Sequence, residues 1–586
     1  MWDIRNNKYY IGTANFIIWS LLISLITLTL LVLNGTLIAV FTKNLTVDFE
    51  NIIKLNPDKQ IQAAILLVKK WILWIIVNRE IIKLNTYNYL VPKILSCILI
   101  PWLMLFTAFL FNITKIRKMQ FIKSRESVYG DAHWATEDEI LKANLRSKEG
   151  MLLGKDDYGY FVSQGFEHSL LFAPTGSGKG VGFVIPNCLY WNHSLIVHDI
   201  KLENYELTSG WRASQGQKVF VWEPSNPDGI THCYNPMDWI SKKPGQMVDD
   251  VQKIANLIIT EKDFWNNEAK SLFLGVVLAL MADETKTNSF GEVVRTLRSD
   301  DVIYNLSVTL DTYGKSIHPA GYMNLVAFLQ KADKERSGVI STLNSGLELW
   351  ANPLIDIATA SSDFNILEMK KIPTTIYVGM TPDNVNRLQK LMQVFYQQAT
   401  EFFTRKIPDL KEEPYGVMLL MDEFPTLGKM EQFKTGIAYF RGYRVRLFLI
   451  VQDTQQLKGI YEEAGMNSFL SNSMYRITFA ANNYETANLI SQLCGNKTVE
   501  QESYGKAKLF KDTGSTNVSF VQRALLLPQE VIQLPRDEQI ILIESFPPIK
   551  SRKIKYFQDP DFKKRLLLQT PVPNQSAKLD KTNKDE

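Results

Sequence analysis

The stretch Phe172–Gly182, FAPTGSGKGVG, is close to the phosphate-binding pattern G-x-x-x-x-G-K-S/T but departs from it at both ends. Gly178 and Lys179 stand where the pattern requires them, whereas Ala173 occupies the first glycine position and Gly180 the hydroxyl position. The apolar run HSLLFA before the loop predicts a buried strand, and VGFVIPNCLYW after it predicts the start of a helix. A strand, a glycine turn and a helix amino terminus direct backbone N–H groups and a positive dipole end at a phosphate. The stretch therefore predicts a nucleotide-binding loop in which Lys179 reaches the β- and γ-phosphates. The alternative is a Gly/Ser turn with an exposed lysine.

A second motif, YGVMLLMDEFPTL, supports the nucleotide-binding interpretation. Its apolar residues run directly into Asp422 and Glu423, as in a buried parallel strand that delivers carboxylates to the carboxyl edge of a sheet, where α/β proteins bind ligands. We expect Asp422 to hold Mg²⁺ through water and Glu423 to orient and polarise the attacking water. Together the two motifs predict an enzyme that hydrolyses ATP with Mg²⁺.

Two further polar residues end predicted strands. Gln452, in VQDTQQL, follows the next strand after the carboxylates, where its side chain could sense the γ-phosphate; an ordinary loop glutamine is the alternative. Asp199 ends the run SLIVHD in the same way. It could contact the site or cap the following helix, and the sequence leaves both roles open.

The rest of the chain after the first quarter alternates strand-like and helical runs, which predicts an α/β fold: a RecA-like P-loop ATPase domain with a parallel-dominated sheet. Besides the two motif strands, the predicted strands are SLIVHDIK (194–201), KVFVWEP (218–224), TTIYVGM (374–380), VRLFLIVQD (445–453), YRITFAA (475–481) and QIILIES (539–545). We assign 126–237 and 366–569 to this domain. Residues 238–365 show helical spacing without a convincing strand and predict an inserted all-α domain. The polar stretch 570–586 predicts a disordered tail.

Composition narrows the class of protein. A chain of 586 residues exceeds a single core and predicts several domains. Cys97, Cys188, Cys233 and Cys494 show no C-x-x-C spacing, which argues against a zinc site or a disulfide framework and fits a reducing compartment. With a net charge of only +4, any nucleic-acid surface must be local.

Residues 1–125 predict a membrane anchor with two transmembrane helices. The run 11–40 holds no charged residue, and 90–111 is a second long apolar run, so each can cross a bilayer. A cleaved signal peptide fits poorly, because the first run is too long and a second follows it. The run 64–77 between them is short and split by two lysines, which favours an interfacial segment.

The orientation of this anchor follows from the nucleotide motifs. Basic residues follow the second span, which favours a cytoplasmic side, although the loop between the spans also carries lysines. ATP is cytoplasmic, and both motifs lie after the second span. We therefore expect the amino terminus and the ATPase domain inside, with the loop 41–89 extracytoplasmic.

Several segments resemble the coupling-protein family of type IV secretion systems, from YGDAHWA at Tyr129 to the end of the predicted sheet. They are APTGSGKGVG, HDIKLENYELTSGWR, YNPMDWI, DFWNNEAKSL, ERSGVISTL, MDEFPTLGKMEQF, GYRVRLFLIVQDTQQLKGIY and SFPPIKSRKIKYF. The resemblance implies that Lys-Gly-Val-Gly replaces the usual Lys-Ser/Thr. The implied nucleotide-binding residues are Thr175, Gly176, Ser177, Gly178, Lys179, Gly180 and Val181. Without a hydroxyl at Gly180, Asp422 and a water are expected to carry more of the Mg²⁺ binding, and Thr175 and Ser177 to contact phosphate.

The same resemblance implies an assembly and a task. The family forms a homo-oligomer, usually a hexamer, in the bacterial inner membrane, beside the channel and ATPase components of the secretion system. ATP hydrolysis there drives DNA–protein or protein substrates, effectors among them, towards the channel, and the helical insert receives the substrate signal. A site between subunits needs an arginine from a neighbour. Of Arg441, Arg444 and Arg446 we choose Arg441, because Arg446 lies within a strand; Arg476 is the alternative.

Two other classes of function remain at this point. A membrane-tethered DNA translocase of chromosome segregation would normally show more spans and a carboxy-terminal DNA-reading domain. A non-hydrolysing scaffold would account for the unusual loop. An ATPase assay distinguishes the scaffold from the motors, and a pulldown with secretion substrates distinguishes the two motors.

Overall fold

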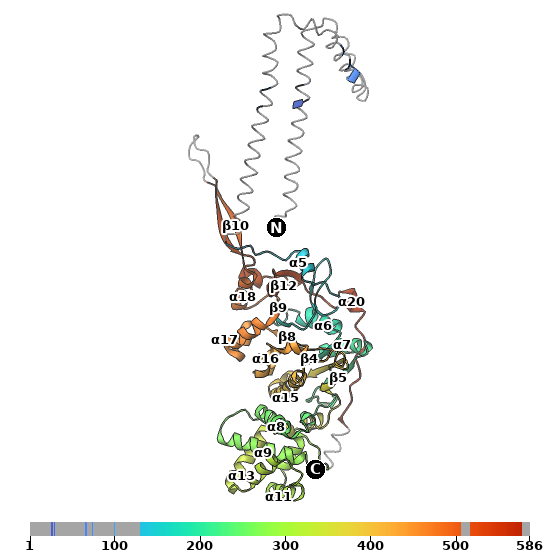
Figure 1. Cartoon of the computed structure of the whole chain (residues 1–586), viewed down its shortest axis with the longest axis vertical. Coiled ribbons are helices and arrows are strands. Elements are labelled where there is room, and N and C mark those ends of the chain that lie inside the picture. The colour runs from blue at the N-terminus through green and yellow to red at the C-terminus, as the bar shows by residue number, and fades with distance from the viewer. Residues whose placement is uncertain are drawn as a thin grey trace. The chain divides into compact units, whose positions relative to one another are not determined.

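The computed structural model describes residues 129–504 and 516–576, together with nine isolated helical positions between Leu25 and Leu103. The chain divides into two compact units, Met1–Glu126 and Ser127–Glu586. The predicted spans 11–40 and 90–111 lie almost wholly outside the described residues. Among the residues that are described, no helix combines the length and apolarity needed to cross a membrane. The second unit carries the fold described below (Figure 1).

A sheet of eleven strands in the order β2-β1-β13-β12-β9-β3-β8-β7-β4-β6-β5 organises the second unit. The strands from β9 to β5 are all parallel, and the remaining four join antiparallel at one side. Their bounds are β1 Met151–Lys155, β2 Tyr160–Ser163, β3 His168–Phe172, β4 Ser194–Asp199, β5 Lys218–Trp222, β6 Thr374–Gly379, β7 Val417–Met421, β8 Val445–Val451, β9 Ser473–Thr478, β12 Glu538–Ile543 and β13 Ile549–Arg552. Every strand predicted from an apolar run is present, and the sheet is dominated by parallel strands as expected.

The central strands are apolar because both faces of the sheet are covered. All residues of β3, β4, β6, β7 and β8 are buried. Successive side chains of a strand point to opposite faces, so Leu170 belongs to one hydrophobic cluster and Leu171 to the other. This double burial explains why the strands read as continuous apolar runs rather than as alternating ones.

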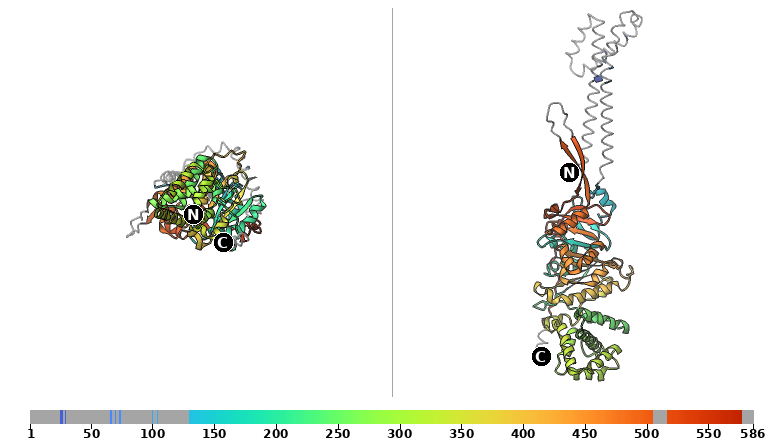
Figure 2. Two further views of the ribbon diagram at one scale, coloured as in Figure 1. Left: turned by 90° about the horizontal axis from the view of Figure 1, so that it is seen from below. Right: turned by 90° about the vertical axis from the view of Figure 1, so that its left-hand side faces the viewer.

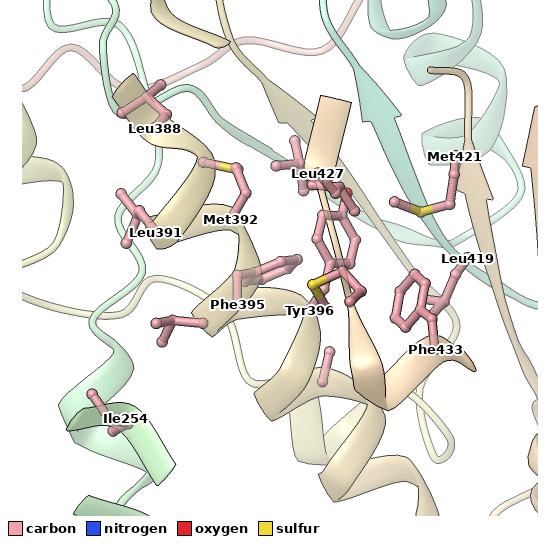
Figure 3. Close-up of a cluster of buried hydrophobic side chains, with 14 of the residues drawn as sticks. Ile254, Leu388, Leu391, Met392, Phe395, Tyr396, Leu419, Met421, Leu427 and Phe433 are labelled. Atoms are coloured by element: carbon pink, nitrogen blue, oxygen red, sulfur yellow. The ribbon is translucent and has the colours of Figure 1, made fainter. Parts of the chain in front are cut away.

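Helices from distant parts of the sequence cover the two faces. They are α6 Ile185–Tyr190, α7 Glu203–Ser214, α15 Val385–Thr404, α16 Glu431–Gly436, α17 Thr454–Asn472 and α18 Tyr484–Cys494, with the short α5 Glu137–Lys142, α19 Pro528–Ile532 and α20 Pro560–Lys563. Figure 3 shows part of one cluster, in which Phe395 and Tyr396 of α15 lie with Leu419 and Met421 of β7. Each fully buried side chain of this size stabilises the fold by roughly 1.5–3 kcal/mol relative to exposure.

Strands β1, β2 and β13 and a separate two-stranded hairpin were not predicted. The hairpin pairs β10, Asn496–Tyr504, with β11, Thr516–Ala524. Its strands are rich in polar residues, and β13, IKSR, alternates buried and exposed positions over only four residues. Such short or polar strands lack the apolar run on which the sequence prediction depended.

Between β5 and β6 the chain forms helices only; we call residues 238–365 the helical insert. Its helices are α8 Pro244–Ile258, α9 Phe264–Leu280, α10 Phe290–Leu297, α11 Val302–Tyr313, α12 Pro319–Leu329, α13 Asp333–Gly346 and α14 Pro353–Ala358. Figure 1 and the right-hand view of Figure 2 show them gathered in one group below the sheet. Since β5 and β6 are hydrogen-bonded neighbours, the chain leaves the sheet at one strand and returns at the next.

The starts of the insert helices follow from local capping. The side chains of Asp263, Ser289 and Asp301 accept hydrogen bonds from backbone N–H groups in the first turns of α9, α10 and α11. Such caps satisfy donors that a helix start leaves unpaired and contribute about 1 kcal/mol each. The insert meets the rest of the unit at two helices. At α8, Lys390 on α15 donates to the carbonyl of Ile258 at 2.7 Å, and at α14, Nε1 of Trp222 donates to the carbonyl of Ala358 at 3.2 Å.

Residues 570–576 do not form the disordered tail that their polarity predicted. The Tyr205 hydroxyl on α7 donates to the carbonyl of Thr570, the N–H of Gln575 donates to Gly229 at 2.7 Å, and the N–H of Thr231 donates to Pro573 at 3.0 Å. Hydrogen bonds of the backbone hold this segment in place. The prediction of disorder used only the polarity of the side chains, which gives no information about such bonds. The remaining residues of the predicted tail, 577–586, lie outside the described part of the chain.

A glycine in α7, Gly210, leaves space for the carboxy-terminal segment at Leu568, just before residues 570–576. An added Cβ at Gly210 would fall on the carbonyl oxygen of Leu568. We expect Gly210→Ala to destabilise the protein by about 1–3 kcal/mol, as overpacking does, and to lower the thermal midpoint. Gly245→Ala in α8 is the control, because a Cβ there meets no atom within 4 Å. If both variants have the same thermal midpoint and the same resistance to proteolysis in the segment after residue 565, the contact between Gly210 and Leu568 is wrong.

Candidate nucleotide-binding site

Three neighbouring strands bring the predicted residues together. The phosphate loop, residues 173–180, follows β3; the two carboxylates follow β7; Gln452 follows β8, which lies between them. Parallel strands end at the same edge of a sheet. The loop, the carboxylates and the glutamine therefore meet at one edge, as the sequence predicted.

The phosphate loop adopts a conformation that glycine permits. Gly176 and Gly178 have φ angles of +75° and +82°, in the left-handed region that side chains with a Cβ disfavour. The N–H of Ser177 donates to the carbonyl of Pro174 at 3.1 Å and closes the turn. A helical segment begins at Gly180 and continues into α6. The backbone thus turns sharply and enters a helix directly after Lys179.

The loop lysine is bonded to the carboxylate motif. Its Nζ donates to the backbone carbonyl of Asp422 at 2.8 Å, lies 3.5 Å from Oδ1 of Asp422, and forms an ion pair with Glu423. The side-chain amide of Gln452 donates to the other oxygen of Glu423 at 3.2 Å. Lys179, Asp422, Glu423 and Gln452 therefore form one connected polar cluster. The ion pair with Glu423 engages the ammonium group that is predicted to bind phosphate.

Asp422 fits a magnesium ligand. Its Oδ1 is buried and has no hydrogen-bond partner among the described residues. Burial raises the pKa of Asp422 and Glu423 adds to that effect, while Lys179 acts in the opposite direction. Among the described residues no cluster of three or more His, Cys, Asp or Glu could hold a metal by itself. Mg²⁺ typically takes one or two carboxylates and completes its shell with phosphates and water, so this lone carboxylate oxygen suits it.

The two glycines after Lys179 have different surroundings. A Cβ added at Gly180 would meet no atom within 4 Å, so crowding within the chain does not explain the missing hydroxyl. A Cβ added at Gly182 would lie 3.2 Å from Cβ of Lys553, a residue that the sequence analysis did not single out. Gly182 therefore leaves space for the Lys553 side chain.

Asp199 caps a helix. Its carboxylate accepts from the N–H of Tyr205 at 2.8 Å and from the Asn204 amide at 3.0 Å, both in the first turn of α7. Burial raises the pKa of Asp199 to about 7, and the charge of Asp422 pushes it in the same direction. The structure shows the capping role, and a direct contact of Asp199 with the nucleotide site stays a prediction.

A buried hydrogen-bond network that the sequence did not predict lies next to the carboxylate motif. The hydroxyl of Thr426 donates to the carbonyl of Glu423 at 2.6 Å, and His198 Nε2 lies 2.9 Å from that hydroxyl, while Nδ1 lies 3.2 Å from the hydroxyl of Tyr396. Burial lowers the pKa of His198 to about 3, so its ring is neutral. Because the Thr426 hydroxyl donates to Glu423, it can only accept from His198. Nε2 of His198 therefore carries the hydrogen, and Nδ1 accepts from the Tyr396 hydroxyl. The network fixes the backbone at Glu423.

The arginines lie away from this cluster within the same chain. Arg441 precedes β8, at the strand end opposite to the phosphate loop; its side chain is 66% exposed and pairs with Glu167 at 3.2 Å. Arg446 is fully buried and donates to Ser163 at 2.8 Å. The structure therefore does not bring Arg441 to the site of its own chain, and its role on a neighbouring subunit stays a prediction.

Comparisons with a family model and with known proteins agree with one another. The model of the family described as Type IV secretory system Conjugative DNA transfer matches residues 125–580. Protein VirD4 of Rhizobium rhizogenes is 32% identical over 75% of this chain, which spans about two thirds (67%) of the relative. Conjugal transfer protein TraG of Escherichia coli is 29% identical over 80% of this chain and 83% of its own length.

A solved structure shares the fold. Plasmid coupling protein TrwB in complex with ADP and Mg²⁺ matches with a TM-score of 0.52 and 15% identity, over 72% of this chain and 94% of TrwB. At this identity the likeness concerns the fold alone, which is the RecA-like P-loop α/β fold that the sequence predicted.

The contrast between the two loop glycines gives a stability test. We expect Gly180→Ala to raise the stability of the nucleotide-free protein by roughly 0.5–1 kcal/mol, because alanine suits a helix better and nothing blocks its methyl group. Gly182→Ala should lower it by about 1–3 kcal/mol, because the new methyl group presses on Lys553. Thermal unfolding of both variants beside the unaltered chain measures the difference, and the same shift for both would refute the described packing.

Proposed function

This chain belongs to the coupling proteins of type IV secretion systems, the family of conjugative DNA transfer, and on that premise we propose that it is an ATP-driven motor that feeds substrates into a secretion channel. The observation that carries the motor assignment is the cluster at the sheet edge. Lys179 from the phosphate loop contacts both carboxylates that follow β7, and Gln452 contacts one of them. A loop, a metal ligand, a water-orienting carboxylate and a γ-phosphate sensor are the parts that ATP hydrolysis needs.

We assign each residue one task. Lys179 binds the β- and γ-phosphates, with Thr175, Ser177 and the loop N–H groups around them. Asp422 would hold Mg²⁺ through water, and the ion would supply positive charge near the phosphates. Glu423 orients the attacking water, and Gln452 responds to the γ-phosphate.

The ion pair between Lys179 and Glu423 suggests how the two residues would act together. A phosphate at Lys179 would compete with Glu423 for the lysine ammonium. The carboxylate, which also accepts from Gln452, would then be available to orient water.

The family resemblance supports a further proposal, that this motor works at a membrane and in a ring. We propose that the uncharged runs 11–40 and 90–111 anchor the protein as a multi-pass protein of the bacterial inner membrane, with the ATPase domain in the cytoplasm. Six subunits would form the ring, with Arg441 of each reaching the next site. It would work with the channel and ATPase components, and its helical insert would receive DNA–protein or protein substrates.

The alternatives are less well supported. The match over residues 125–580 to a conjugative-transfer family favours secretion over chromosome segregation. The connected cluster of lysine, carboxylates and glutamine favours hydrolysis over a scaffold.

Two substitutions test hydrolysis. Lys179→Ala should leave the protein folded, because the side chain is 24% exposed and bonds only within the cluster, and should reduce ATP turnover by about 100-fold or more. Glu423→Gln should reduce turnover by about 10²–10⁴-fold while ATP binds at least as tightly, because a neutral amide no longer competes for Lys179. Turnover assays and equilibrium binding of ATP measure both. Unchanged turnover after Lys179→Ala would reject the loop assignment, and loss of ATP binding after Glu423→Gln would make Glu423 a structural residue.

The insert is tested by shortening it. Ile258 and Ile259 lie beside Gly346, so a short Gly/Ser linker can replace residues 260–345 while α8 stays on α15. We expect loss of secretion and of substrate pulldown, with ATP turnover per folded molecule retained. As a milder variant that keeps the fold, Met323→Asp alters a side chain that is 68% exposed on α12. Substrate binding that survives while turnover collapses would assign the insert to the motor instead.

A further inference from the structure

A second lysine, Lys553, lies against the phosphate loop. It directly follows β13, and its N–H donates to the carbonyl of Asp537 at 2.9 Å. Its ammonium donates to the backbone carbonyl of Ser177 at 3.0 Å and sits 3.7 Å from the centre of the Phe479 ring. The residue is only 6% exposed. A charged side chain from 376 positions away is thus buried against the backbone of the loop.

The charge of Lys553 is only weakly compensated. Asp537, whose charge acts on it, is paired with Lys555 at 2.6 Å. Over residues 129–504 and 516–576, no carboxylate lies within 4 Å of the Lys553 ammonium; its partners are a carbonyl and an aromatic face. Burial lowers the pKa of Lys553 to about 8. A buried cation with neutral partners costs free energy, and a nearby anionic ligand would offset that cost.

The geometry indicates what this cation does to the loop. The carbonyl of Ser177 and the N–H of Gly178 belong to one peptide group, and in a trans peptide they point in opposite directions. Because Lys553 holds the carbonyl, the Gly178 N–H points away from Lys553, and the contact fixes that direction. In this pattern the N–H groups of the loop cradle the phosphates. Gly182 supports the arrangement, because a Cβ there would lie 3.2 Å from the Cβ of Lys553 and the lysine stem would have to shift.

We propose that Lys553 is a positioning residue of the nucleotide site, which aims the Gly178 N–H at the phosphates and adds a positive charge behind the loop. It recognises a polyphosphate through the loop and not by direct contact. The inference rests on the proposed function, because it requires that the loop binds nucleotide.

A pH dependence follows from the same arrangement. A bound polyphosphate favours the protonated lysine and raises its pKa, so binding takes up a proton above the pKa of the free state. Affinity should therefore be constant below pH 8 and fall by up to about 10-fold per pH unit above it. The charged groups around Lys553 are Asp537 and Lys555 on its own side and Lys179 of the loop, whose ammonium faces Glu423.

The experiment measures binding of Mg²⁺–ADP to the full chain between pH 7 and 9.5, and ATP turnover beside it. Lys553→Met keeps the length of the side chain and removes its charge. We expect about 10-fold weaker binding at pH 7, which corresponds to about 1.4 kcal/mol, a raised KM, a kcat within about threefold, and a flat pH profile. Lys550→Met is the matched control, because this lysine of the same β13 strand is 46% exposed and pairs with Glu538; its affinity and profile should equal those of the unaltered chain.

The outcomes separate the two proposals. If the unaltered chain binds no Mg²⁺–ADP, the proposed function fails, and with it the premise. If it binds and Lys553→Met binds equally well, Lys553 has no role at the site. Weaker binding with an unchanged fall above pH 8 would reduce Lys553 to a packing role and overturn the inference. Should Lys553→Met not fold, the profile of the unaltered chain decides: affinity that does not fall above pH 8 rejects the proposal.

Discussion

The parallel pairing of β3, β8 and β7 is the constraint on which the site depends. Hydrogen bonds in this register align Phe172 with Val451 and Met421 with Leu449, so the three strands end together and release their loops at one edge. The loop lysine and the carboxylates come from positions about 240 residues apart and meet only because this register holds. The register is strongly determined, because the side chains are buried on both faces. A shift by one residue would move each side chain from one hydrophobic cluster to the other.

Much of this arrangement could be predicted from the sequence, because its signals are local. Continuous apolar runs identified the buried parallel strands, and the polar residues that end them, Asp422, Glu423 and Gln452, do lie together. The loop glycines at 176 and 178 have the positive φ angles that the pattern implies. These features depend on residues adjacent in the chain, so a single sequence carries them.

The features that were missed depend on distant partners. Lys553 is an ordinary lysine in a basic stretch until the fold puts it against Ser177, and Thr426 and His198 become a network only when β4 lies beside β7. Of the antiparallel strands at one side of the sheet, β1, β2 and β13 are only four or five residues long, so their pairing, and not their composition, defines them. The segment 570–576 was wrongly predicted as disordered for a related reason. It is held by hydrogen bonds of its backbone to distant residues, and the polarity of its side chains gives no sign of these bonds.

The helical insert enters and leaves the sheet at β5 and β6, and β5 is the outermost strand. Nothing in the order or register of the other strands depends on what joins these two ends. A lineage can therefore lengthen, shorten or exchange the insert while the motor keeps its geometry. With the insert as the substrate receptor that we propose, cargo preference and energy conversion would be separable traits, and selection could change the first without altering the second.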